Sequence, residues 1–580
     1  MLTQLTIRNF KLFEKVDVPL GNGFVFVGPN NSGKTTALQA LALWHIGLTR
    51  WLARRSGNGG KKNRGAILNR KDLIDVPIAH MDLIWHDRKV RKATNQNIFI
   101  EIVVEGVNQD KTWQCGLEFQ YASNETFYCR PLRTDREGNQ RMDVPDEAKD
   151  VRVFFLPPMS GLASEEPLIQ QGRIHVLMGQ GQTAEVLRNL CYNVSSQEDK
   201  SDWQAITRHM KALFGVDMHE PQYAASRGAI VLEYTDAHRK KPLDLPSSGR
   251  GMQQVLLLFA YLYGHPVHGS PKNTVFVLDE PDAHLETLRQ NETYKLLNEA
   301  AERRGDQIIA ASHSEALLES SIRREEAVAF LGVRPRPRIL GKGQKAHVID
   351  ALKTIGFQYY YLAAQKGWVL YLEGDTDLSI LQAFAKKLNH PAEDSLSYPC
   401  VKYVGLEAQT ARKHFHSLKA AEEDLQGFLL LDHIPSLETA QNLHEHMWQK
   451  NEIENYLCHR DALVAYVKAD LRDGDMFDES RMKEYERIIE EEVDRLVKLY
   501  EAVKKPQPFS DDIKASDDFL VPLFENFVER AGMKETLYRY RKTNFHRLVD
   551  YIPKDAIDAE VKDVLDTIHM IDKKAQKTLK

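Results

Sequence analysis

The chain has 580 residues, 42% of them hydrophobic and 27% charged, which is ordinary for a soluble globular protein and predicts two or three domains. Its formal net charge of −5 gives no general affinity for nucleic acid, so any such role must rest on local groups of basic residues. The five cysteines are scattered, without a CxxC pair or a Cys/His cluster at zinc spacing, which argues against a zinc site.

The N-terminal segment predicts a strand rather than a targeting signal. Met1 leads directly into an amphipathic stretch from Leu5 to Glu14, and no apolar stretch in the chain is long enough to span a membrane. We therefore expect a cytoplasmic protein without a membrane partner, whose first strand lies within residues 5–14.

A glycine-rich loop follows the apolar run Phe24 to Val27 and leads into a helical segment. Its pattern, G-x-x-x-x-G-K-[ST], lets backbone N–H groups close around phosphates, while Lys34 reaches the β and γ phosphates and Thr35 offers a hydroxyl to Mg²⁺. The sequence therefore predicts an ATP site with its Mg²⁺. The residues expected to bind ATP here are Gly28, Asn30, Asn31, Ser32, Gly33, Lys34, Thr35 and Thr36.

Between this loop and the next acidic motif lie two strand-like runs, Ile98 to Glu105 and Val151 to Leu156, and no heptad pattern long enough for a long coiled coil. A polar loop from Pro246 to Gln254 then opens an apolar helix over Val255 to Leu262. Taken alone, this loop predicts an ordinary helix cap, in which a serine accepts from free N–H groups.

Two further strands end in polar side chains. The run from Thr274 to Asp279 is a Walker B pattern, in which Asp279 would hold Mg²⁺ and Glu280 would act as the catalytic group that orients or deprotonates the attacking water. The run Gln307 to Ser312 precedes His313, which could contact the γ-phosphate.

The order of these motifs resembles ABC-type ATPases. Ser247, Ser248 and Gly249 are similar to the signature loop of that family, and Asp282 to Leu285 and His313 are similar to the segments that follow Walker B. In that family the signature loop of one protomer closes over the nucleotide of another, so the resemblance implies at least a homodimer. The first strand and the long separation of Lys34 from Asp279 resemble the RecF, SMC and OLD branch. This implies an α/β, ABC-type (RecF/SMC-like) P-loop ATPase over residues 1–340.

Beyond a Pro/Gly-rich boundary and a connecting segment at 341–365, two more strand-like runs end in acids. Trp368 to Leu372 precedes Glu373 and Asp377, and Gly427 to Leu431 precedes Asp432. Carboxylates at the tips of neighbouring strands can converge on one divalent metal ion. The alternative is a capped strand-to-helix turn with surface acids.

These strand ends resemble a Toprim domain, which implies a Rossmann-like α/β domain over residues 366–470. In that family the glutamate matched by Glu373 is a catalytic acid/base or metal ligand, Asp377 matches an additional acid of nuclease members, and Asp432 matches the first DxD aspartate. The second DxD acid is replaced by Ile434. The acids that could take its place as Mg²⁺ or Mn²⁺ ligands are Glu438 or, as a better match to OLD-like Toprim domains, Glu452 and Glu454.

The remaining residues, 471–580, predict helical additions, including an amphipathic helix over Glu484 to Lys504. Tyr538 to Lys542 mixes rings and cations, as a nucleic-acid contact does. OLD-like nucleases resemble this sequence in carrying a functional lysine late in the chain, which makes Lys542 the candidate contact. A solvated helix face is the alternative.

An ATPase followed by a Toprim domain is the arrangement of the OLD (overcoming lysogenization defect) nuclease family, which includes Gabija-type and other antiphage-defence effectors. The resemblance implies an ATP-regulated, Mg²⁺- or Mn²⁺-dependent endonuclease that acts on nucleic acid, DNA above all, as a homo-oligomer, with a separate defence subunit as a possible partner. Two alternatives stay open. One is an ATPase sensor or scaffold whose degenerate Toprim domain docks another effector, and the other is a RecF/SMC-like DNA repair ATPase.

Overall fold

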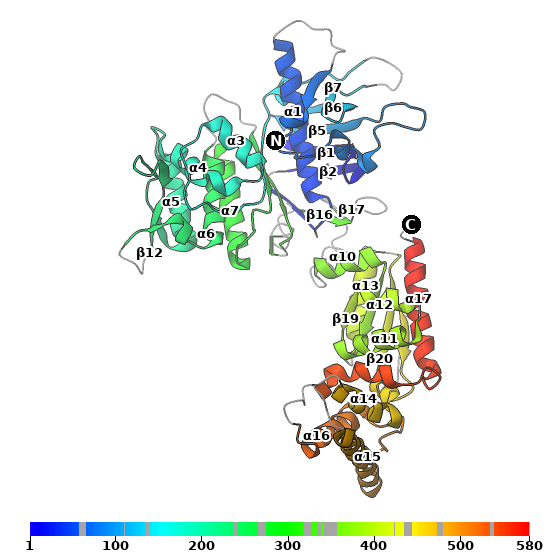
Figure 1. Cartoon of the computed structure of the whole chain (residues 1–580). Helices are drawn as coiled ribbons and strands as arrows, with labels where there is room; N and C mark the ends of the chain where they lie inside the picture. Colours follow the sequence, from blue (N-terminus) through cyan, green and yellow to red (C-terminus); the bar gives the residue numbers. More distant parts are fainter. Residues whose placement is uncertain are drawn as a thin grey trace. The chain divides into compact units, whose positions relative to one another are not determined.

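The computed structural model divides into two compact units, Met1–Ala346 and His347–Lys580, each described here by itself (Figure 1). None of the helices in the described part of the chain is long and apolar enough to cross a membrane. The structure describes residues 1–578 except 22, 29, 57–64, 109–110, 135–139, 237–240, 265–273, 315, 318–326, 333–337, 341–355, 406, 423, 434–442, 473–478 and 534–538.

The first sheet of the N-terminal unit is antiparallel and has one buried face. In β5 (Ile100–Asn108), buried and half-buried residues alternate, as expected where one face of a sheet packs on a core. The segment predicted as one strand is a hairpin, because the chain turns at Lys11 (φ 46°) and Phe10 pairs with Phe13. The strand order is β2-β1-β5-β6-β7-β4, with β1 (Leu2–Phe10), β2 (Phe13–Pro19), β4 (Ala66–Asn69), β6 (Lys111–Ser123) and β7 (Thr126–Pro131).

The second sheet of this unit is parallel except for its edge strand β17, and it carries the nucleotide motifs. Its strand β3 (Phe24–Val27) is buried along its whole length, which suits a strand covered on both faces. The carboxyl ends of parallel strands meet at one edge, so the predicted motifs after β3, β14 and β15 gather there. The order is β17-β16-β3-β15-β14-β8, with β8 (Arg152–Leu156), β14 (Thr274–Asp279), β15 (Gln307–Ser312), β16 (Ala327–Gly332) and β17 (Arg338–Leu340).

Helices complete the N-terminal unit. The helix α1 (Lys34–Ser56) contacts strands of both sheets, and one hydrophobic core joins it to them. A group of helices that includes α5, α6 and α7 forms a separate lobe of this unit (Figure 1). The helix α6 spans Arg250–Tyr263, longer than predicted. The other elements of this part are α2 (Asp146–Lys149), α3 (Gln171–Gly179), α4 (Leu187–Ser195), α5 (Ser201–Phe214), α7 (Thr287–Arg304), β9 (Val216–Met218), β10 (Gln222–Ala224), β11 (Ala229–Val231), β12 (Glu233–Asp236) and β13 (Leu243–Asp244).

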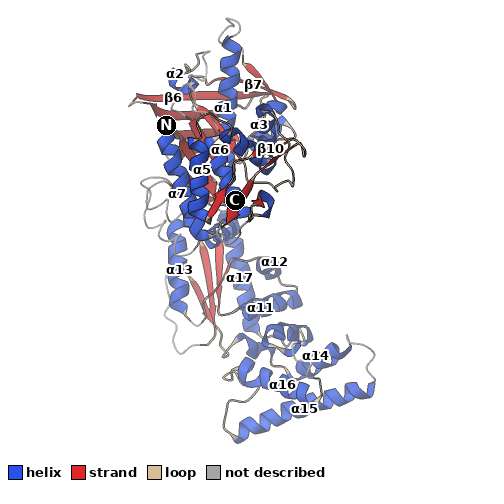
Figure 2. Ribbon diagram, turned by 90° about the vertical axis from the view of Figure 1, so that its left-hand side faces the viewer, coloured by secondary structure: helices blue, strands red, loops and turns tan. Residues whose placement is uncertain are grey.

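The C-terminal unit is built on a parallel sheet of order β19-β18-β20-β21. Figure 2 shows α13 on one side of this sheet and α11, α12 and α17 on the other. The elements are α10 (Phe357–Lys366), β18 (Trp368–Leu372), α11 (Asp375–Leu388), α12 (Ala392–Ser397), β19 (Val401–Tyr403), α13 (Ala408–Ala421), β20 (Gln426–Leu431), β21 (His444–Met447), α14 (Arg460–Arg472), α15 (Glu479–Ala502), α16 (Val521–Arg530) and α17 (Ala559–Thr578).

One hydrophobic core runs from this sheet to the last helices. It contains Leu370 and Leu430 of the strands together with Val493 of α15 and Ile568 of α17. Trp368 Nε1 also donates to Asp572 Oδ1 at 2.9 Å. The border predicted between residues 470 and 471 therefore lies inside a single packed unit.

The core of the N-terminal unit predicts a measurable effect at Trp44. Its side chain is fully buried and Nε1 donates to the Cys115 carbonyl at 3.0 Å. Trp44→Ala should lower the free energy of unfolding by about 3 to 5 kcal/mol, measured by urea unfolding, because it opens a large cavity. Leu288→Ala is the control, since Leu288 is 85% exposed and its loss should cost no more than about 0.5 kcal/mol. Equal effects of the two changes would contradict this packing.

Candidate functional sites

The phosphate-binding loop has the backbone that its glycines allow. Gly33 has a φ of 102°, and a Cβ there would lie 2.5 Å from the Phe13 ring. At Gly28 a Cβ would lie 2.4 Å from the Phe330 carbonyl oxygen. Asn30 and Asn31 are exposed, whereas Ser32 and Thr36 are buried, and Ser32 Oγ has no hydrogen-bond partner within the described residues. Residues with a side chain would therefore not fit at Gly28 or Gly33.

Lys34 lies folded over this loop. Its side chain is buried, and Nζ donates to the Gly28 carbonyl at 2.7 Å. Burial lowers the pKa of Lys34, and the negative charges of Asp279 and Glu280 act in the opposite direction. A bound phosphate would offer this ammonium group a stronger acceptor than the carbonyl.

The two predicted Mg²⁺ ligands of the ATP site are in direct contact. Thr35 Oγ1 lies 3.1 Å and 3.0 Å from the two carboxylate oxygens of Asp279. Burial raises the pKa of Asp279 to about 6, although the hydrogen bond from Thr35 lowers it. A divalent cation between them would favour the ionised carboxylate.

The residues predicted to act on the γ-phosphate also meet. His313 Nδ1 lies 3.7 Å from Glu280 Oε1, and both side chains are partly exposed. Glu280 has a φ of 51°, an unusual backbone for this residue type that aims its side chain out of the end of β14. The pair can therefore reach a water molecule and a phosphate.

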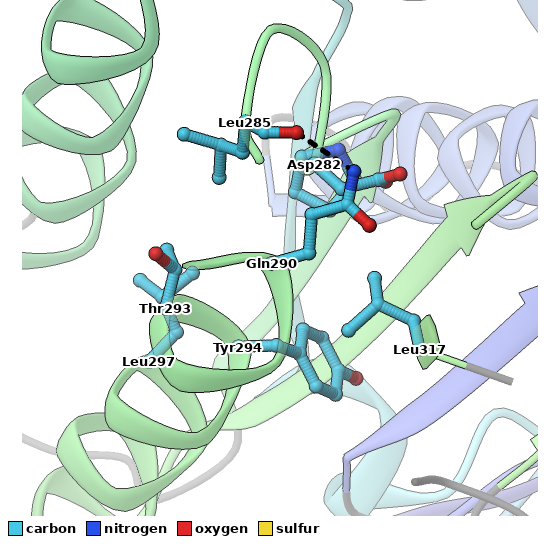
Figure 3. Close-up of a pocket in the computed structure, with 8 residues that line it drawn as sticks. Asp282, Leu285, Gln290, Thr293, Tyr294, Leu297 and Leu317 are labelled. Atoms are coloured by element: carbon cyan, nitrogen blue, oxygen red, sulfur yellow. Dashed lines mark hydrogen bonds between the residues drawn. The ribbon is translucent and has the colours of Figure 1, made fainter. Parts of the chain in front are cut away.

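Asp282 and Leu285, from the segment that follows β14, line a small pocket (Figure 3). Asp282 is buried, accepts from Ser312, and keeps Oδ1 without a hydrogen-bond partner among the described residues; burial raises its pKa. Gln290 Nε2 donates to the Leu285 carbonyl at 2.9 Å, and Gln290 Oε1 accepts from Ser314 Oγ at 2.6 Å. Gln290 belongs to no sequence motif. The sequence analysis therefore missed its role in joining the segments after β14 and β15.

The loop similar to an ABC signature precedes α6. Gly249, not a serine, is the N-cap of this helix, and Ser248 Oγ donates to the Leu245 carbonyl instead. The interpretation of a serine cap was therefore wrong. Ser247 and Gly249 are exposed, and among described residues no hydrogen bond or ion pair joins Ser247 to Gly249 with the phosphate-binding loop. Gln254 Nε2 of α6 does contact the Pro281 carbonyl at 3.3 Å.

The strand-end acids of the C-terminal unit form a second site. Glu373 follows β18 and Asp432 follows β20, and these strands are adjacent and parallel. The two carboxyl groups are hydrogen-bonded to each other. Burial raises the pKa of Asp432 to about 9, and the charge and hydrogen bond of Glu373 act in the same direction.

Asp377 both caps a helix and belongs to the acidic site, the two alternatives that the sequence left open. Its Oδ2 accepts from the backbone N–H groups of Glu373 and Gly374, each at 3.1 Å, and so caps the start of α11. This contact explains why α11 begins at Asp375. The carboxyl group is also part of the acidic site, since burial raises its pKa to about 6 and the charge of Glu373 contributes to the shift.

Glu452, Glu454 and Lys542 join the same site. Lys542 Nζ lies 3.9 Å from Glu454 Oε1 and donates to Ser516 Oγ at 2.9 Å. The Ser516 N–H in turn donates to Glu452 Oε1. Burial raises the pKa of Glu454 to about 8, as does the charge of Glu452, while Lys542 lowers it. Ser516 was missed because nothing in its surroundings in the sequence marks it.

Several predicted residues lie outside the described part of the chain, namely Ile434, Glu438 and Tyr538. No group of three or more His, Cys, Asp or Glu side chains among the described residues is arranged to hold a metal ion as it stands. Two buried carboxylate oxygens, Glu373 Oε2 and Glu454 Oε1, nevertheless have no hydrogen-bond partner there. The site is thus a crowded set of acids, partly held together by shared protons.

This crowding predicts how stability varies with pH in EDTA. The folded-state pKa of Glu454 lies above its unfolded value of about 4, so the folded state binds the proton more tightly. The contribution of this proton to the free energy of unfolding is complete at low pH. It is lost as the pH rises from 5 to 8, and the free energy of unfolding falls by up to about 1.4 kcal/mol per pH unit. Urea unfolding of wild type and Glu454→Gln should show a steeper loss in wild type. Added Mg²⁺ should reduce the loss of stability in wild type. If the stability of wild type and of Glu454→Gln depended on pH in the same way, the crowding would be contradicted.

Two models of known protein families match stretches of the N-terminal unit. A family model described as "AAA ATPase domain" matches residues 1–45, and one described as "AAA domain, putative AbiEii toxin, Type IV TA system" matches residues 180–319. The N-terminal unit is therefore an ATPase domain.

Relatives match the chain over short stretches. An OLD nuclease of Thermus scotoductus is 49% identical over 43 residues, which are 7% of this chain and 8% of that protein. The DNA replication and repair protein RecF of Proteus mirabilis is 52% identical over 42 residues, 7% of this chain and 12% of that protein. Among solved structures, the SMC head domain from Thermotoga maritima and an SMC head bound to the C-winged helix domain of ScpA align with 59% of this chain and 98% of theirs. Their identities are 14% and 13%, with TM-scores of 0.31 and 0.33.

Proposed function

Because the N-terminal unit is an ATPase domain, we propose that the protein is an ATP-regulated, metal-dependent nuclease of the OLD type whose C-terminal unit is a Toprim domain. One observation carries the proposal. Acids from separate segments of the chain, the half-buried Glu373 and Asp432 and the buried Glu454, crowd at the carboxyl edge of one parallel sheet, beside Lys542. Acids crowded in this way keep raised pKa values and stay protonated unless a bound cation favours their ionised forms.

The donor set fits a hard divalent cation. Mg²⁺ and Mn²⁺ prefer carboxylate oxygens, and two such oxygens here are buried without a hydrogen-bond partner among the described residues. Glu373, Asp377 and Asp432, with Glu452 or Glu454, would hold the ion. When bound, it supplies positive charge that stabilises a scissile phosphate and lowers the pKa of water.

The chain's own groups would do the rest of the chemistry at this site. Lys542 is held by Ser516 so that its ammonium group can approach a phosphate oxygen and offset negative charge as a phosphodiester bond breaks. One carboxylate oxygen of Glu373 has no hydrogen-bond partner among the described residues and can accept a proton from water. Nucleic acid, with DNA as the favoured substrate, therefore enters at the carboxyl edge of β18 and β20.

The ATP site would regulate this chemistry. Lys34 binds the phosphates, Thr35 and Asp279 hold Mg²⁺, and Glu280 and His313 act on water and the γ-phosphate. Ser247 and Gly249 are exposed, as a loop must be to close over the nucleotide of a second protomer. A homodimer, antiphage defence and a separate defence subunit belong to this proposal through the resemblance to OLD proteins.

The short similarity to RecF favours a second candidate, a DNA repair ATPase. That function leaves the acids around Asp432 without a role. A docking module without metal affinity is the third candidate, and it too leaves the buried acids unexplained.

Cleavage assays on the full chain would test the proposal. Wild-type protein would be incubated with supercoiled plasmid and single-stranded DNA in Mg²⁺, Mn²⁺ or EDTA, with and without ATP. We expect cutting with metal only, at a rate that ATP changes. Calorimetry would separate the docking candidate, since Mn²⁺ should bind wild type and bind Asp432→Asn at least about tenfold more weakly. No cutting and no Mn²⁺ binding that depends on Asp432 would contradict the proposal.

A further inference from the structure

A second cavity lies in the N-terminal unit, away from the phosphate-binding loop. It encloses about 250 Å³ between α1, β8, α3 and the turn around Ile74, with Tyr261 of α6 on one wall. The end of α3 packs tightly against this turn, because a Cβ at Gly179 would lie 1.8 Å from Ile74 Cγ2. None of the proposed functions uses this cavity.

The charges around the cavity do not cancel. Asp72 is compensated, because it pairs with Arg50 at 2.5 Å and accepts from the Asn69 N–H at 2.9 Å. Asp75 makes no hydrogen bond or ion pair with any residue that the structure describes. Burial raises the pKa of Asp75 to about 6, and a cation bound beside the carboxyl group would favour its ionised form.

The two histidines of the cavity do not supply the missing positive charge. Burial and the charge of Arg152 lower the pKa of His45 to about 4, and burial lowers the pKa of His175. His45 Nε2 is buried and has no hydrogen-bond partner among the described residues, so it can serve as an acceptor. The cavity thus offers one uncompensated carboxylate and one unused nitrogen.

Apart from Thr49, the remaining lining is apolar or aromatic and includes Phe154 and Phe155 of β8 and Tyr261 of α6. Aromatic rings favour a cation, and apolar walls favour a ligand with a hydrocarbon body. We propose that this cavity binds a small organic cation, an amine or amidine on an apolar body, whose charge lies against Asp75.

The position of the cavity makes its ligand an effector of the ATPase. The helix α1 begins at Lys34, β8 pairs with β14 which ends at Asp279, and α6 begins after Gly249. The ligand therefore touches α1, β8 and α6, each of which carries or adjoins an ATPase motif. His45 stands eleven residues after Lys34, about 16 Å along the helix, so the ligand does not compete with the phosphates.

Benzamidine and its neutral counterpart benzamide provide the test, with the full chain in a calorimeter and in an ATPase assay. We expect benzamidine to bind at least tenfold more tightly than benzamide, and saturating benzamidine to change the ATPase rate about fivefold or more. Asp75→Asn should lose this preference, whereas Asp75→Glu, which keeps the charge, should retain part of it. Thermal unfolding would verify that both variants fold.

Three results would overturn the proposal. Equal binding of benzamidine and benzamide to wild type would mean that the cavity has no preference for charge, a conclusion that requires no variant. Unchanged benzamidine affinity in folded Asp75→Asn would place the probe elsewhere. Tight binding without any change in the ATPase rate would overturn the coupling. All three are independent of nuclease activity.

Discussion

Glu373→Gln should reduce metal-dependent cleavage of plasmid by more than about 100-fold, since losing even an outer-shell partner of a metal site costs about 10- to 100-fold. The substitution keeps the shape of the side chain and removes its charge. It therefore removes both a candidate metal ligand and the carboxylate oxygen that has no hydrogen-bond partner among the described residues. Initial cleavage rates at saturating Mg²⁺ or Mn²⁺ would measure the effect, and ATP hydrolysis should stay at the wild-type rate.

The matched control is Asp424→Asn. Asp424 is exposed and precedes β20, at the opposite end of the strand from Asp432. The Asp424→Asn substitution changes the net charge of the C-terminal unit by the same amount as Glu373→Gln but leaves the acidic site intact. Cleavage should therefore change less than about twofold. If both variants cut like wild type, the nuclease centre does not lie at these strand ends.

Lys34→Ala should lower ATP hydrolysis by roughly 100-fold or more, because a single group that stabilises a transition state is worth about 10²- to 10³-fold. The buried ammonium group beside Asp279 is the nearest positive charge that this loop offers to a β- or γ-phosphate. Steady-state phosphate release would measure the loss. DNA cleavage without ATP should persist, whereas its response to ATP should disappear.

Lys111→Ala is the control for this experiment, because Lys111 lies on β6 of the same unit and is 73% exposed. Its hydrolysis rate should match wild type. Hydrolysis by Lys34→Ala at the wild-type rate would exclude the loop as the ATP site. Loss of cleavage without ATP in Lys34→Ala would mean that the two activities are not separate.

The backbone around the predicted nucleotide site follows from local sequence patterns. Gly28, Gly33 and Lys34 lie in one short loop, where neighbouring residues determine the backbone conformation. The acids after β14 follow from a single apolar run and from the rule that parallel strands end at one edge. The sequence assigned Glu280 to the attacking water and His313 to the γ-phosphate, whereas their contact with each other is found only in the structure.

Other features depend on tertiary contacts that no local pattern encodes. Ser516 meets Glu452 and Lys542 because a π-helical segment, Ala515–Leu520, brings it there. The turn at Lys11 requires a positive φ that a lysine gives no reason to expect. Gly249 rather than Ser248 caps α6, because the Ser248 hydroxyl donates to the Leu245 carbonyl. The Toprim assignment stays a prediction.

The place of β3 between β15 and β16 has a consequence for synthesis of the chain on the ribosome. Neither neighbouring strand exists until about three hundred further residues have been made, and the same is true of the contact between Leu2 and Gln307, which stand 305 positions apart. At about 5 to 20 residues per second, that delay is roughly 15 to 60 s. Throughout it, the nascent GPNNSGKTT segment has no sheet to hold it in shape. A growing chain should therefore not bind ATP until its Walker acids have emerged.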